Sequence, residues 1–350
     1  MILVLNCGSQ SIKWKLFADN LKVIKEGRCD VFNSKNYQKT LTSELEKLRE
    51  QNNIKVIGHR VVHAGGKFTK PALLTAGTLK TLEKFNKLAP LHNPFNVLGI
   101  KVSQKIFPKA KQIAVFDTEF FADLPLQSAI YPLPEKIREK YGFKRFGFHG
   151  ISHEYVAKEG ARIIGKSFNK LKIITCHLGG GASIAAIRNG KAIDTSMGFT
   201  PMEGLVMMTR CGNLDPGVIL RLAEDIGIQK LDFILNQESG IKGICGLSDM
   251  RDVLKAVKKG NKPRSRASSL RGKKAKLALE IFIYSIQKYI GAYFAILGGC
   301  DLLIFTGAIG SGSAKITNMI CKNLLILKNT KILSIKTDEE LAIAQKISER

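Results

Sequence analysis

Short apolar runs that end at small or polar residues recur along the chain and alternate with longer helical patterns. Four of these runs have the length of a buried strand and are bounded by turn residues: Ile2–Asn6, Gln112–Thr118, Lys172–His177 and Leu302–Thr306. Helical spacing of apolar residues lies between them, as at Pro94–Ile106 and Leu277–Tyr293. Strands that alternate with helices predict an α/β architecture.

Two segments repeat one plan of strand, Gly/Ser turn and strand. The first reads LNCGSQSIKWKLF and begins at Leu5, and the second reads CHLGGGASIAAIRNGKAI and begins at Cys176. Each predicts a tight hairpin whose turn presents backbone N–H groups, and two such turns would suit a polyphosphate held between two related domains. A break at 118–124 is a candidate domain boundary, and Asp338–Glu349 predicts a final helix with an acidic first turn, which suits the helix dipole.

The composition is that of a soluble globular protein, with 45% hydrophobic and 24% charged residues. Ile290–Cys300 is apolar but has only eleven residues, three of them glycine, so it predicts a buried helix that runs into a core strand and not a membrane span. The N-terminus lacks the basic stretch of a secretory signal. The seven cysteines are scattered and form no CxxC, which favours a reducing, cytoplasmic setting over a disulfide scaffold or a cysteine zinc site.

The formal net charge of +26 is the most unusual bulk property. The segment Lys255–Lys276 holds ten basic residues and no acidic one. Such a segment can form a nucleic-acid or membrane-surface patch, or it can be a solvated lysine-rich surface. No aromatic residue interleaves it to stack on bases, so we favour the solvated surface and do not expect specific nucleic-acid binding.

Two glycine-rich turns each follow a predicted strand, at Gly179–Gly181 and at Thr306–Ser313. Glycine allows the backbone to approach a phosphate closely and leaves N–H groups that can donate to it. Neither turn is a Walker A loop, and the first strand is not followed by a GxGxxG fingerprint. Taken alone, each turn is equally typical of simple strand punctuation.

All six histidines fall within one third of the chain, and two pairs, His59/His63 and His149/His153, have the i, i+4 spacing of zinc ligands on a helix. The segment GHRVVHAGG has the β-branched composition of a strand, however, and no HExxH is present. We therefore favour polar core partners or phosphate donors over metal ligands.

Three arginines, Arg60, Arg210 and Arg251, lie in unusually apolar or glycine-rich surroundings. A guanidinium in such a place usually meets a carboxylate or a phosphate through two parallel hydrogen bonds. A buried structural ion pair is an equally good interpretation for any one of them.

At this point a series of motifs identifies a family. They are NCGSQSIK, GHRVVHAGG, LAPLHNP, VFDTEF, YPLP, FGFHGISH, CHLGGGASI, DTSMGFTPMEGLVMMTRCGNLDPG, SGIKGICGLSDMRD, YIGAYFAILGGCDLLIFTGAIG and TDEELAIA. In this order, from end to end, the chain resembles the acetate kinases, within the acetate and sugar kinase/heat-shock/actin superfamily. The run DTSMGFTPMEGL followed by TRCG is the most specific part of the resemblance.

The resemblance implies an α/β fold of two duplicated actin-like ATPase (ribonuclease H-like) domains with an interdomain cleft, in a cytoplasmic homodimer. The expected N-terminal domain comprises residues 1–119 and is closed by the C-terminal helix, residues 337–350. The expected nucleotide-binding domain comprises residues 120–336.

The resemblance also implies roles for individual residues. The expected catalytic residues are Asp117, His149 and Arg210. The expected acetate or acetyl-phosphate site has Arg60, with an apolar methyl pocket from Val62, Leu91, Phe148 and Pro201. The expected ATP contacts are Ser9, Ser11, Lys13, His177, Leu178, Gly179, Gly180, Gly181, Asp249, Met250, Arg251, Ala308, Ile309, Gly310, Ser311 and Gly312. The expected ligands of Mg2+ are Asn6 and Glu339.

The activity that follows is a phosphotransferase with a carboxyl acceptor: reversible, Mg2+-dependent, direct in-line transfer between ATP and acetate that gives acetyl phosphate and ADP, in acetyl-CoA biosynthesis. Mn2+ is expected to substitute for Mg2+. The acceptor carboxylate is ionised at neutral pH, so positioning and charge stabilisation matter more than a strong base. A propionate or butyrate kinase is the alternative within this class, because one methylene in an apolar pocket discriminates by only about 1–3 kcal/mol.

A third hypothesis is a catalytically impaired nucleotide-binding homologue, and departures from the family pattern motivate it. Gln10, Phe121, Gly180, Met208, Ala308 and Ser311-Gly312 replace the usual residues. Most of these changes fall on the nucleotide side. The residues expected at the reacting centre are all present, which favours an active enzyme.

Overall fold

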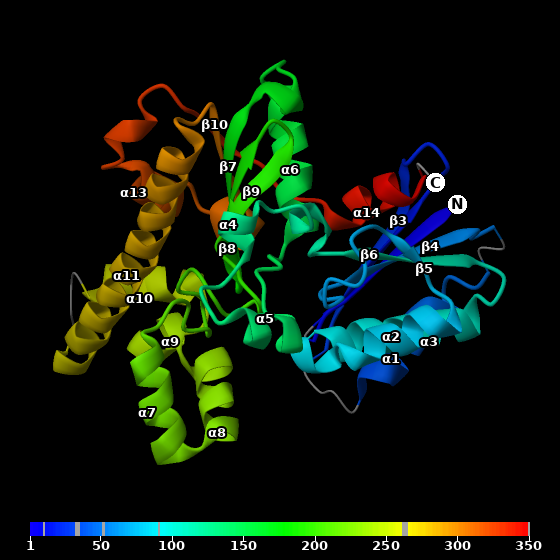
Figure 1. The fold of residues 1–350 in the computed structure, drawn as a ribbon, viewed down its shortest axis with the longest axis horizontal. Helices are drawn as coiled ribbons and strands as arrows, with labels where there is room; N and C mark the ends of the chain where they lie inside the picture. Colours follow the sequence, from blue (N-terminus) through cyan, green and yellow to red (C-terminus); the bar gives the residue numbers. More distant parts are fainter. Residues whose placement is uncertain (10, 32–35, 51–52, 90–91, 261–264, 349–350) are drawn as a thin grey trace. The chain divides into compact units, whose positions relative to one another are not determined.

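The computed structural model describes residues 1–9, 11–31, 36–50, 53–89, 92–260 and 265–348. The chain packs into two compact units (Figure 1). The first unit comprises Met1–Ala122, Phe148–Tyr155 and Asp338–Arg350, and the second comprises Asp123–Gly147 and Val156–Thr337. This grouping describes packing, and the expected division into domains at residues 119/120 and 336/337 stays a prediction.

The first unit is built on a six-stranded mixed sheet with the order β3-β2-β1-β4-β6-β5. Its strands are β1 Ile2–Cys7, β2 Ser11–Phe17, β3 Val23–Asp30, β4 Val56–Val61, β5 Ala72–Leu73 and β6 Lys111–Phe116. β1, β2 and β3 form an antiparallel meander, whereas β1, β4 and β6 run parallel. Parallel neighbours end at the same edge of a sheet, so the carboxyl ends of these three strands lie together.

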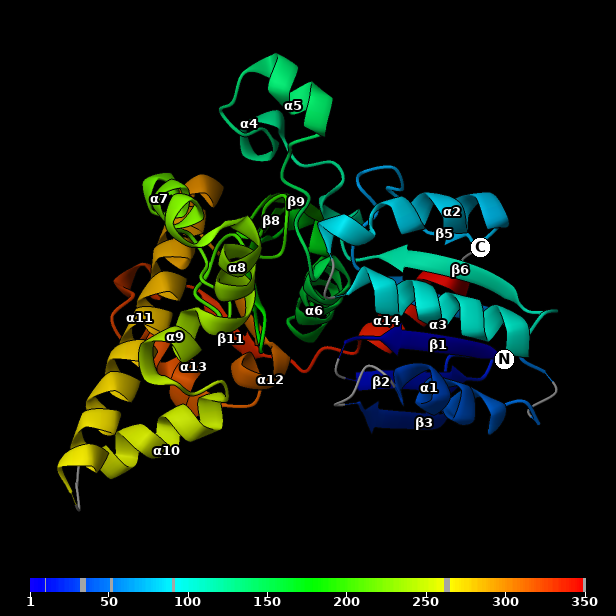
Figure 2. The same ribbon diagram turned by 90° about the horizontal axis from the view of Figure 1, so that it is seen from below.

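Helices cover both faces of this sheet (Figure 2). They are α1 Tyr37–Glu46, α2 Ala76–Lys84, η2 Asn86–Leu88, α3 Asn93–Ile106, η3 Glu119–Phe121, α14 Glu339–Ser348 and the start of α6 Gly150–Ile163. Alternate residues of β1 point to opposite faces, so Leu3 and Leu5 pack with α1, while Ile2 and Val4 pack with Ile343 of α14. The sheet is therefore the middle of three layers.

The second unit has a five-stranded sheet with the order β11-β10-β7-β8-β9. Its strands are β7 Lys172–Leu178, β8 Ala182–Arg188, β9 Lys191–Thr195, β10 Leu302–Thr306 and β11 Lys331–Ser334. β7, β8 and β9 again form an antiparallel meander, and β7, β10 and β11 run parallel. The two sheets thus share one plan, in which β1 corresponds to β7 and β4 to β10, and both predicted hairpins are confirmed.

The longest element of the second unit is α11, Arg266–Leu297, which begins with a Ser265/Ser268 capping box and ends at Gly298 in the left-handed conformation. α11 and the second half of α6 lie on opposite sides of the sheet (Figures 1 and 2). The other helices are α4 Leu126–Ala129, α5 Glu135–Tyr141, η4 Phe168–Lys170, α7 Pro216–Ile226, α8 Ile228–Phe233, η5 Ile234–Glu238, α9 Gly240–Cys245, α10 Met250–Gly260, α12 Gly307–Gly310, α13 Ala314–Cys321 and η6 Leu325–Leu327.

The four predicted strands are confirmed as β1, β6, β7 and β10, with bounds that differ by at most two residues. The two predicted helices lie within α3 and α11, and the final helix is α14. Within the described ranges, no helix has both the length and the apolar sequence that a membrane crossing requires. The seven cysteines are free thiols.

Candidate active site

The first unit gathers several expected site residues around one guanidinium. Arg60 Nε and Nη2 donate to the two carboxylate oxygens of Asp117 at 3.0 and 2.6 Å. Arg60 Nη1 lies 2.9 Å from a carboxylate oxygen of Glu339 and 3.3 Å from Oδ1 of Asn6. Asn6 Nδ2 donates to Glu339 at 3.2 Å and to Glu340 at 2.9 Å. These five residues form a continuous network, called the Arg60 cluster below.

The sheet topology explains why residues so distant in sequence meet. Asn6 lies near the end of β1, Arg60 lies near the end of β4 and Asp117 directly follows β6. These three strands are parallel neighbours or nearly so, and their carboxyl ends share one edge. α14 begins with Glu339 and Glu340 and contributes both carboxylates to the same place.

Burial and charge oppose each other in this cluster. The Asp117 side chain is 1% exposed and that of Arg60 is 18% exposed. Burial raises the pKa of Asp117, and the Arg60 guanidinium counteracts part of this rise. Burial also disfavours the Arg60 cation, but the facing carboxylates of Asp117 and Glu339 outweigh it and raise the pKa of Arg60. The protonation of each group therefore depends on its neighbours.

The start of α6 is fastened to Asp117. Gly150 N–H donates to the Asp117 main-chain oxygen at 2.8 Å, and a side chain at Gly150 would collide with that oxygen. His149, with φ at 58°, adopts the left-handed conformation, and its backbone N–H donates to the Asp117 carboxylate. The positive end of the α6 dipole thus faces the carboxylate. The structure therefore brings Asp117, His149 and Arg60 together, as expected from the sequence.

The turn after β1 lies at the same edge of the sheet. Gly8 N–H donates to the Ser11 main-chain oxygen at 2.9 Å, with Ser9 inside the turn. Lys13 on β2 lies opposite Asn6 in the hairpin register. Ser9, Ser11 and Lys13 therefore adjoin the Arg60 cluster. Gln10 lies outside the described residues.

Two of the four expected methyl-pocket residues are placed in the first unit. Val62 follows β4 and is buried, and its N–H donates to Asn96 Oδ1 at 3.1 Å. Phe148 is buried beside His149 and packs edge-on against His63, with ring centroids 5.3 Å apart. Leu91 lies outside the described residues, and Pro201 belongs to the second unit.

The histidines of GHRVVHAGG have the polar core partners that the sequence favoured. His59 lies on β4, so the predicted strand is confirmed, and its Nε2 is 2.7 Å from Gln112 Oε1. Burial lowers the pKa of His59 to about 4, although Gln112 opposes the shift. His63 Nδ1 accepts the Gly65 N–H at 2.9 Å.

In the second unit, the two glycine-rich turns lie side by side. They follow β7 and β10, which are parallel neighbours with His177 opposite Thr306. Gly179 N–H donates to the Gly181 main-chain oxygen at 2.9 Å and closes the first turn. Gly307 has φ at 80°, and a Cβ there would lie 2.5 Å from the Leu178 main-chain oxygen. Only glycine allows this close approach, which holds the segment 307–312 against 177–181.

Arg210 lies near the first of these turns. Met208 N–H donates to the Gly180 main-chain oxygen at 3.2 Å, which fixes the segment Met207–Arg210 against the turn. Arg210 Nη1 donates to the Pro201 main-chain oxygen at 3.3 Å, so Arg210 and Pro201 are brought together. Burial lowers the pKa of Arg210 below its ordinary value. The guanidinium remains charged at neutral pH all the same.

Asp249, Met250 and Arg251 lie at the start of α10. Asp249 Oδ1 accepts the Arg251 N–H at 2.8 Å and caps the helix. The exposed Arg251 guanidinium pairs with the Asp249 carboxylate at 2.5 Å, and the side-chain hydrogen bond from Arg251 lowers the pKa of Asp249 to about 2. Met250 is buried, so its side chain belongs to the packing of α10.

A second buried arginine supports the loop after β9, and sequence reasoning missed it. Arg145 Nη2 pairs with Glu203 at 2.7 Å, and Nη1 donates to the Thr195 main-chain oxygen at 3.2 Å. The Tyr131 hydroxyl donates to Glu203 and accepts the Phe199 N–H at 2.8 Å. Glu203 lies inside the motif DTSMGFTPMEGL and Arg145 directly precedes FGFHGISH, but no spacing rule pairs them. They hold the loop that carries Pro201.

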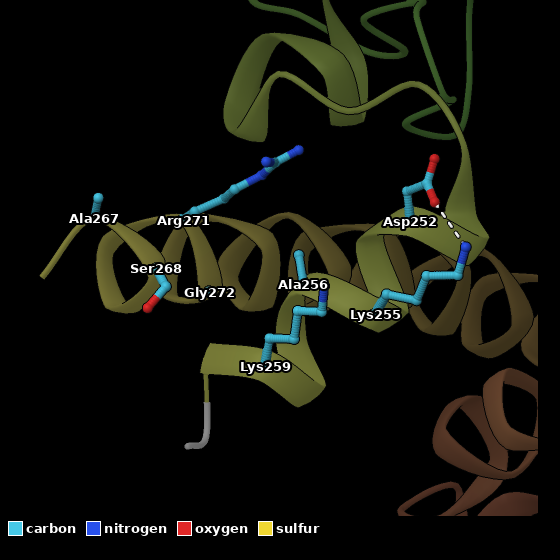
Figure 3. A pocket seen from close by; sticks show the side chains of 8 residues that line it. All are labelled: Asp252, Lys255, Ala256, Lys259, Ala267, Ser268, Arg271 and Gly272. Atoms are coloured by element: carbon cyan, nitrogen blue, oxygen red, sulfur yellow. Dashed lines mark hydrogen bonds and ion pairs between the residues drawn. The ribbon is translucent and has the colours of Figure 1, made fainter. Parts of the chain in front are cut away.

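The basic segment lines a surface pocket of about 420 Å3 between α10 and α11 (Figure 3). Its lining residues are Asp252, Lys255, Ala256, Lys259, Ala267, Ser268, Arg271 and Gly272. Lys255 pairs with Asp252 at 3.1 Å. The lining includes three cations and no aromatic side chain, so it offers no platform for stacked bases. The interpretation as a solvated surface stays a prediction.

The oxygen donors of the Arg60 cluster fit a hard divalent cation. Mg2+ prefers carboxylate and amide oxygens and usually takes one or two carboxylates together with substrate phosphates. Asn6 Oδ1 and the Glu339 carboxylate supply such donors in one place. Among the described residues, no group of three or more His, Cys, Asp or Glu side chains is arranged to hold a metal ion.

Comparison with known proteins places this geometry in a family. The pattern that defines the acetokinase family matches residues 39–350. An acetate kinase from Halothermothrix orenii is 42% identical over 399 aligned positions, covering 98% of each chain. The crystal structure of Porphyromonas gingivalis acetate kinase has a TM-score of 0.85 at 33% identity and covers 98% of both chains. A propionate kinase from Francisella tularensis has a TM-score of 0.87 at 35% identity and covers 99% of this chain and 98% of that one.

These likenesses agree with the two sheets of shared strand order, and the predicted α/β fold of duplicated actin-like domains is confirmed. Several of the family residues that the sequence pointed to, among them Asn6, Arg60, Asp117 and His177, lie at the carboxyl ends of parallel strands in the two sheets. The chain therefore belongs to the acetokinase family.

Proposed function

We propose that this chain is an acetate kinase, a transferase that moves a phosphoryl group reversibly between ATP and acetate and gives acetyl phosphate and ADP. The observation that carries the proposal is the Arg60 cluster, in which a buried guanidinium and three oxygen-bearing partners meet at one sheet edge. Membership of the acetokinase family supports the choice of a carboxylate as acceptor.

Phosphoryl transfer to acetate depends more on positioning the two reactants than on proton transfer. Acetate is ionised at neutral pH and is already a nucleophile, so no strong general base is needed. The acceptor and the phosphate are both anions, and cations must hold them in line while charge spreads over the transferred group. Fixed cationic donors supply that stabilisation without reorganising during the reaction.

In the first unit, Arg60 takes the acyl end of acetate or acetyl phosphate. Arg60 holds Asp117 through two hydrogen bonds but contacts Glu339 through one oxygen, so the Glu339 contact is the one to be exchanged for the substrate. Asp117 then keeps Arg60 oriented, and His149, fastened to Asp117, donates to the transferred group. The buried side chains of Val62 and Phe148 contact the methyl group from the first unit, and the expectation that Leu91 and Pro201 also do so stays part of the proposal.

Asn6 and Glu339 hold the Mg2+ ion, and Mn2+ substitutes for it. When bound, the ion neutralises phosphate charge. Its ligands are partners that Arg60 has in this structure, so the residues that would bind the metal contact the residue that would bind the acyl group.

In the second unit, the adjacent turns at 177–181 and 308–312 hold the nucleotide phosphates through backbone N–H groups. The family's ATP contacts at Ser9, Ser11 and Lys13 are part of the proposal for the first unit. Asp249, Met250 and Arg251 line the remainder of the ATP site. Arg210 joins His149 in stabilising the transition state, and its burial strengthens its field because little water screens it.

Formation of acetyl phosphate, trapped as the hydroxamate, tests the proposal. The purified protein is incubated with ATP, Mg2+ and acetate, and Arg60→Met is the matched control. We expect a product that depends on all three components and that Arg60→Met fails to make. The absence of product over a blank at saturating ligands would leave the impaired nucleotide-binding homologue as the better hypothesis.

A propionate kinase is the second candidate, because the Francisella propionate kinase matches this chain as well in structure as the acetate kinase does. The same assay with acetate, propionate and butyrate separates them by kcat/KM. We expect acetate to be preferred, and a clear preference for a longer acid would overturn that choice.

We also propose a cytoplasmic homodimer that serves acetyl-CoA biosynthesis. Large apolar side chains on α7 and α8, namely Leu220, Ile228 and Phe233, are exposed, and a second copy would remove them from water. Light scattering is expected to give twice the monomer mass for the natural chain and the monomer mass for Leu220→Glu/Ile228→Glu.

A further inference from the structure

Lys346 is a partly buried cation outside the Arg60 cluster. Its ammonium nitrogen lies 3.0 Å from a carboxylate oxygen of Glu119 and 2.7 Å from one of Glu154. The three side chains are between 14% and 20% exposed. Burial lowers the pKa of Lys346, but Glu154 and Glu119 outweigh it, so its pKa is raised and the ammonium stays charged.

Each member of this triad lies on an element that carries, or begins within two residues of, a residue of the proposed active site. Lys346 is on α14, which begins with Glu339. Glu119 is two residues past Asp117. Glu154 is on α6, the helix that begins directly after His149. None of these three elements directly follows another in the sequence, so the triad joins segments that are distant along the chain.

The spacing along α14 shows how the triad acts. Glu339 and Lys346 are seven residues apart, which is about two helical turns or 10 Å on the same face. α14 is therefore linked to the segment after β6 at two points, indirectly through Glu339, whose partner Arg60 holds Asp117, and directly through Lys346 with Glu119. Ile151 packs against Ile343 of the same helix, so the pair Lys346–Glu154 is the polar part of the contact between α6 and α14.

We propose that Lys346 is a positioning residue for the proposed phosphoryl transfer: by clamping Glu119 and Glu154, it fixes the start of α6 against Asp117 and so sets the place of His149. The inference rests on the proposed function. Lys346 touches no expected ligand, and it acts through Asp117 and His149. A displacement of about 1 Å at a reacting group can cost about 100-fold in rate.

The test compares Lys346→Met with Lys346→Arg in the hydroxamate assay. We expect kcat to fall by about 100-fold in Lys346→Met, because the cation that joins α14 to both carboxylates is then gone, while KM for ATP changes by less than about threefold. Lys346→Arg keeps a cation that reaches both carboxylates and is expected to restore most of kcat. Lys101→Met, which breaks the exposed pair with Glu83 in the same unit, is the matched control and should leave kcat unchanged.

A double-mutant cycle distinguishes positioning from general stability. If Lys346 acts through His149, then Lys346→Met in a His149→Ala background lowers kcat by less than about threefold. The proposal is wrong if the fold-losses in kcat of Lys346→Met and His149→Ala multiply in the double variant. It is also wrong if Lys346→Met alone keeps kcat near that of the natural chain.

Folding is checked by Trp14 fluorescence, and where Lys346→Met does not fold, Glu119→Gln/Lys346→Met/Glu154→Gln takes its place in the same cycle. This triple variant removes the clamp without leaving unpaired buried carboxylates. A natural chain that forms no hydroxamate would refute the proposed function. The NMR chemical shift of the His149 ring in Lys346→Met, compared with that in the natural chain, then tests whether Lys346 positions His149. An unchanged chemical shift overturns the proposal.

Discussion

Replacing Arg60 by methionine removes the one cation of the Arg60 cluster and keeps a side chain of similar length. In the natural chain, the guanidinium compensates Asp117 and Glu339, both of which are buried. The variant leaves two carboxylates facing each other in a site with little water. We therefore expect loss of activity together with a large loss of stability in the first unit.

The size of that loss follows from the burial. Breaking a buried ion pair by removing one partner costs about 3–5 kcal/mol. With a urea slope of about 2 kcal/mol per molar for a unit of this size, the midpoint of unfolding should fall by roughly 1.5–2.5 M. Trp14 is the only tryptophan and is buried in the core of the first unit, so its fluorescence reports the unfolding of that unit.

Two further variants test whether burial causes the loss of stability. Arg28→Met removes an arginine from the same sheet, where Arg28 pairs with Asp30 at the surface, and should cost no more than about 1 kcal/mol. Arg60→Met/Asp117→Asn removes one of the carboxylate charges that Arg60 compensates and should recover part of the midpoint without recovering product. A midpoint for Arg60→Met equal to that of Arg28→Met would refute the reasoning from burial.

Three further predictions concern the remaining parts of the site. Gly307→Ala should raise KM for ATP and destabilise the second unit by about 1–3 kcal/mol, because a Cβ would meet the Leu178 oxygen at 2.5 Å, whereas Gly180→Ala, whose Cβ meets nothing within 4 Å, should change stability little in the same thermal melt. Because the pKa of His59 is about 4 when folded, protonation below pH 6.5 favours unfolding. The free energy of unfolding, measured by urea titration, should therefore fall by up to about 3 kcal/mol between pH 6.5 and 4, and it should fall by less in His59→Gln. Asp117→Asn should lower kcat by about 10- to 100-fold at unchanged KM for ATP in the hydroxamate assay, and retention of most turnover would show that Asp117 is dispensable.

The sequence predicted the central strands because they are continuous apolar runs. β1, β6, β7 and β10 are buried on both faces, so each of them is a recognisable block of hydrophobic residues. β3 is different. It lies at the edge of its sheet, most of its residues are exposed, and VIKEGRCD has no apolar block that would separate it from a loop. Its place is fixed by pairing with β2, which is a contact of the folded chain and not a property of its local sequence.

The identity of the site residues came from motifs, and their pairings did not. Asn6 and Glu340 are 334 positions apart, and Lys346 and Glu119 are 227 apart. Local periodicity extends over only a few residues, so it cannot select which carboxylate of the Glu339-Glu340 dipeptide meets Arg60. The packing of α14 on the sheet makes that choice, while parallel strand order brings the ends of β1, β4 and β6 to one edge.

The position of α14 has a consequence for how the protein is made. This helix is translated after the entire second unit, yet it covers one face of the first sheet, where Ile2, Val4 and Val115 are buried beneath it. During synthesis, that apolar face stays in contact with water or a chaperone while the more than two hundred residues between Ala122 and Glu339 emerge from the ribosome. The amino-terminal half therefore cannot mature first, and a ribosome that stalls before residue 339 leaves behind a nascent chain with a ready surface for aggregation.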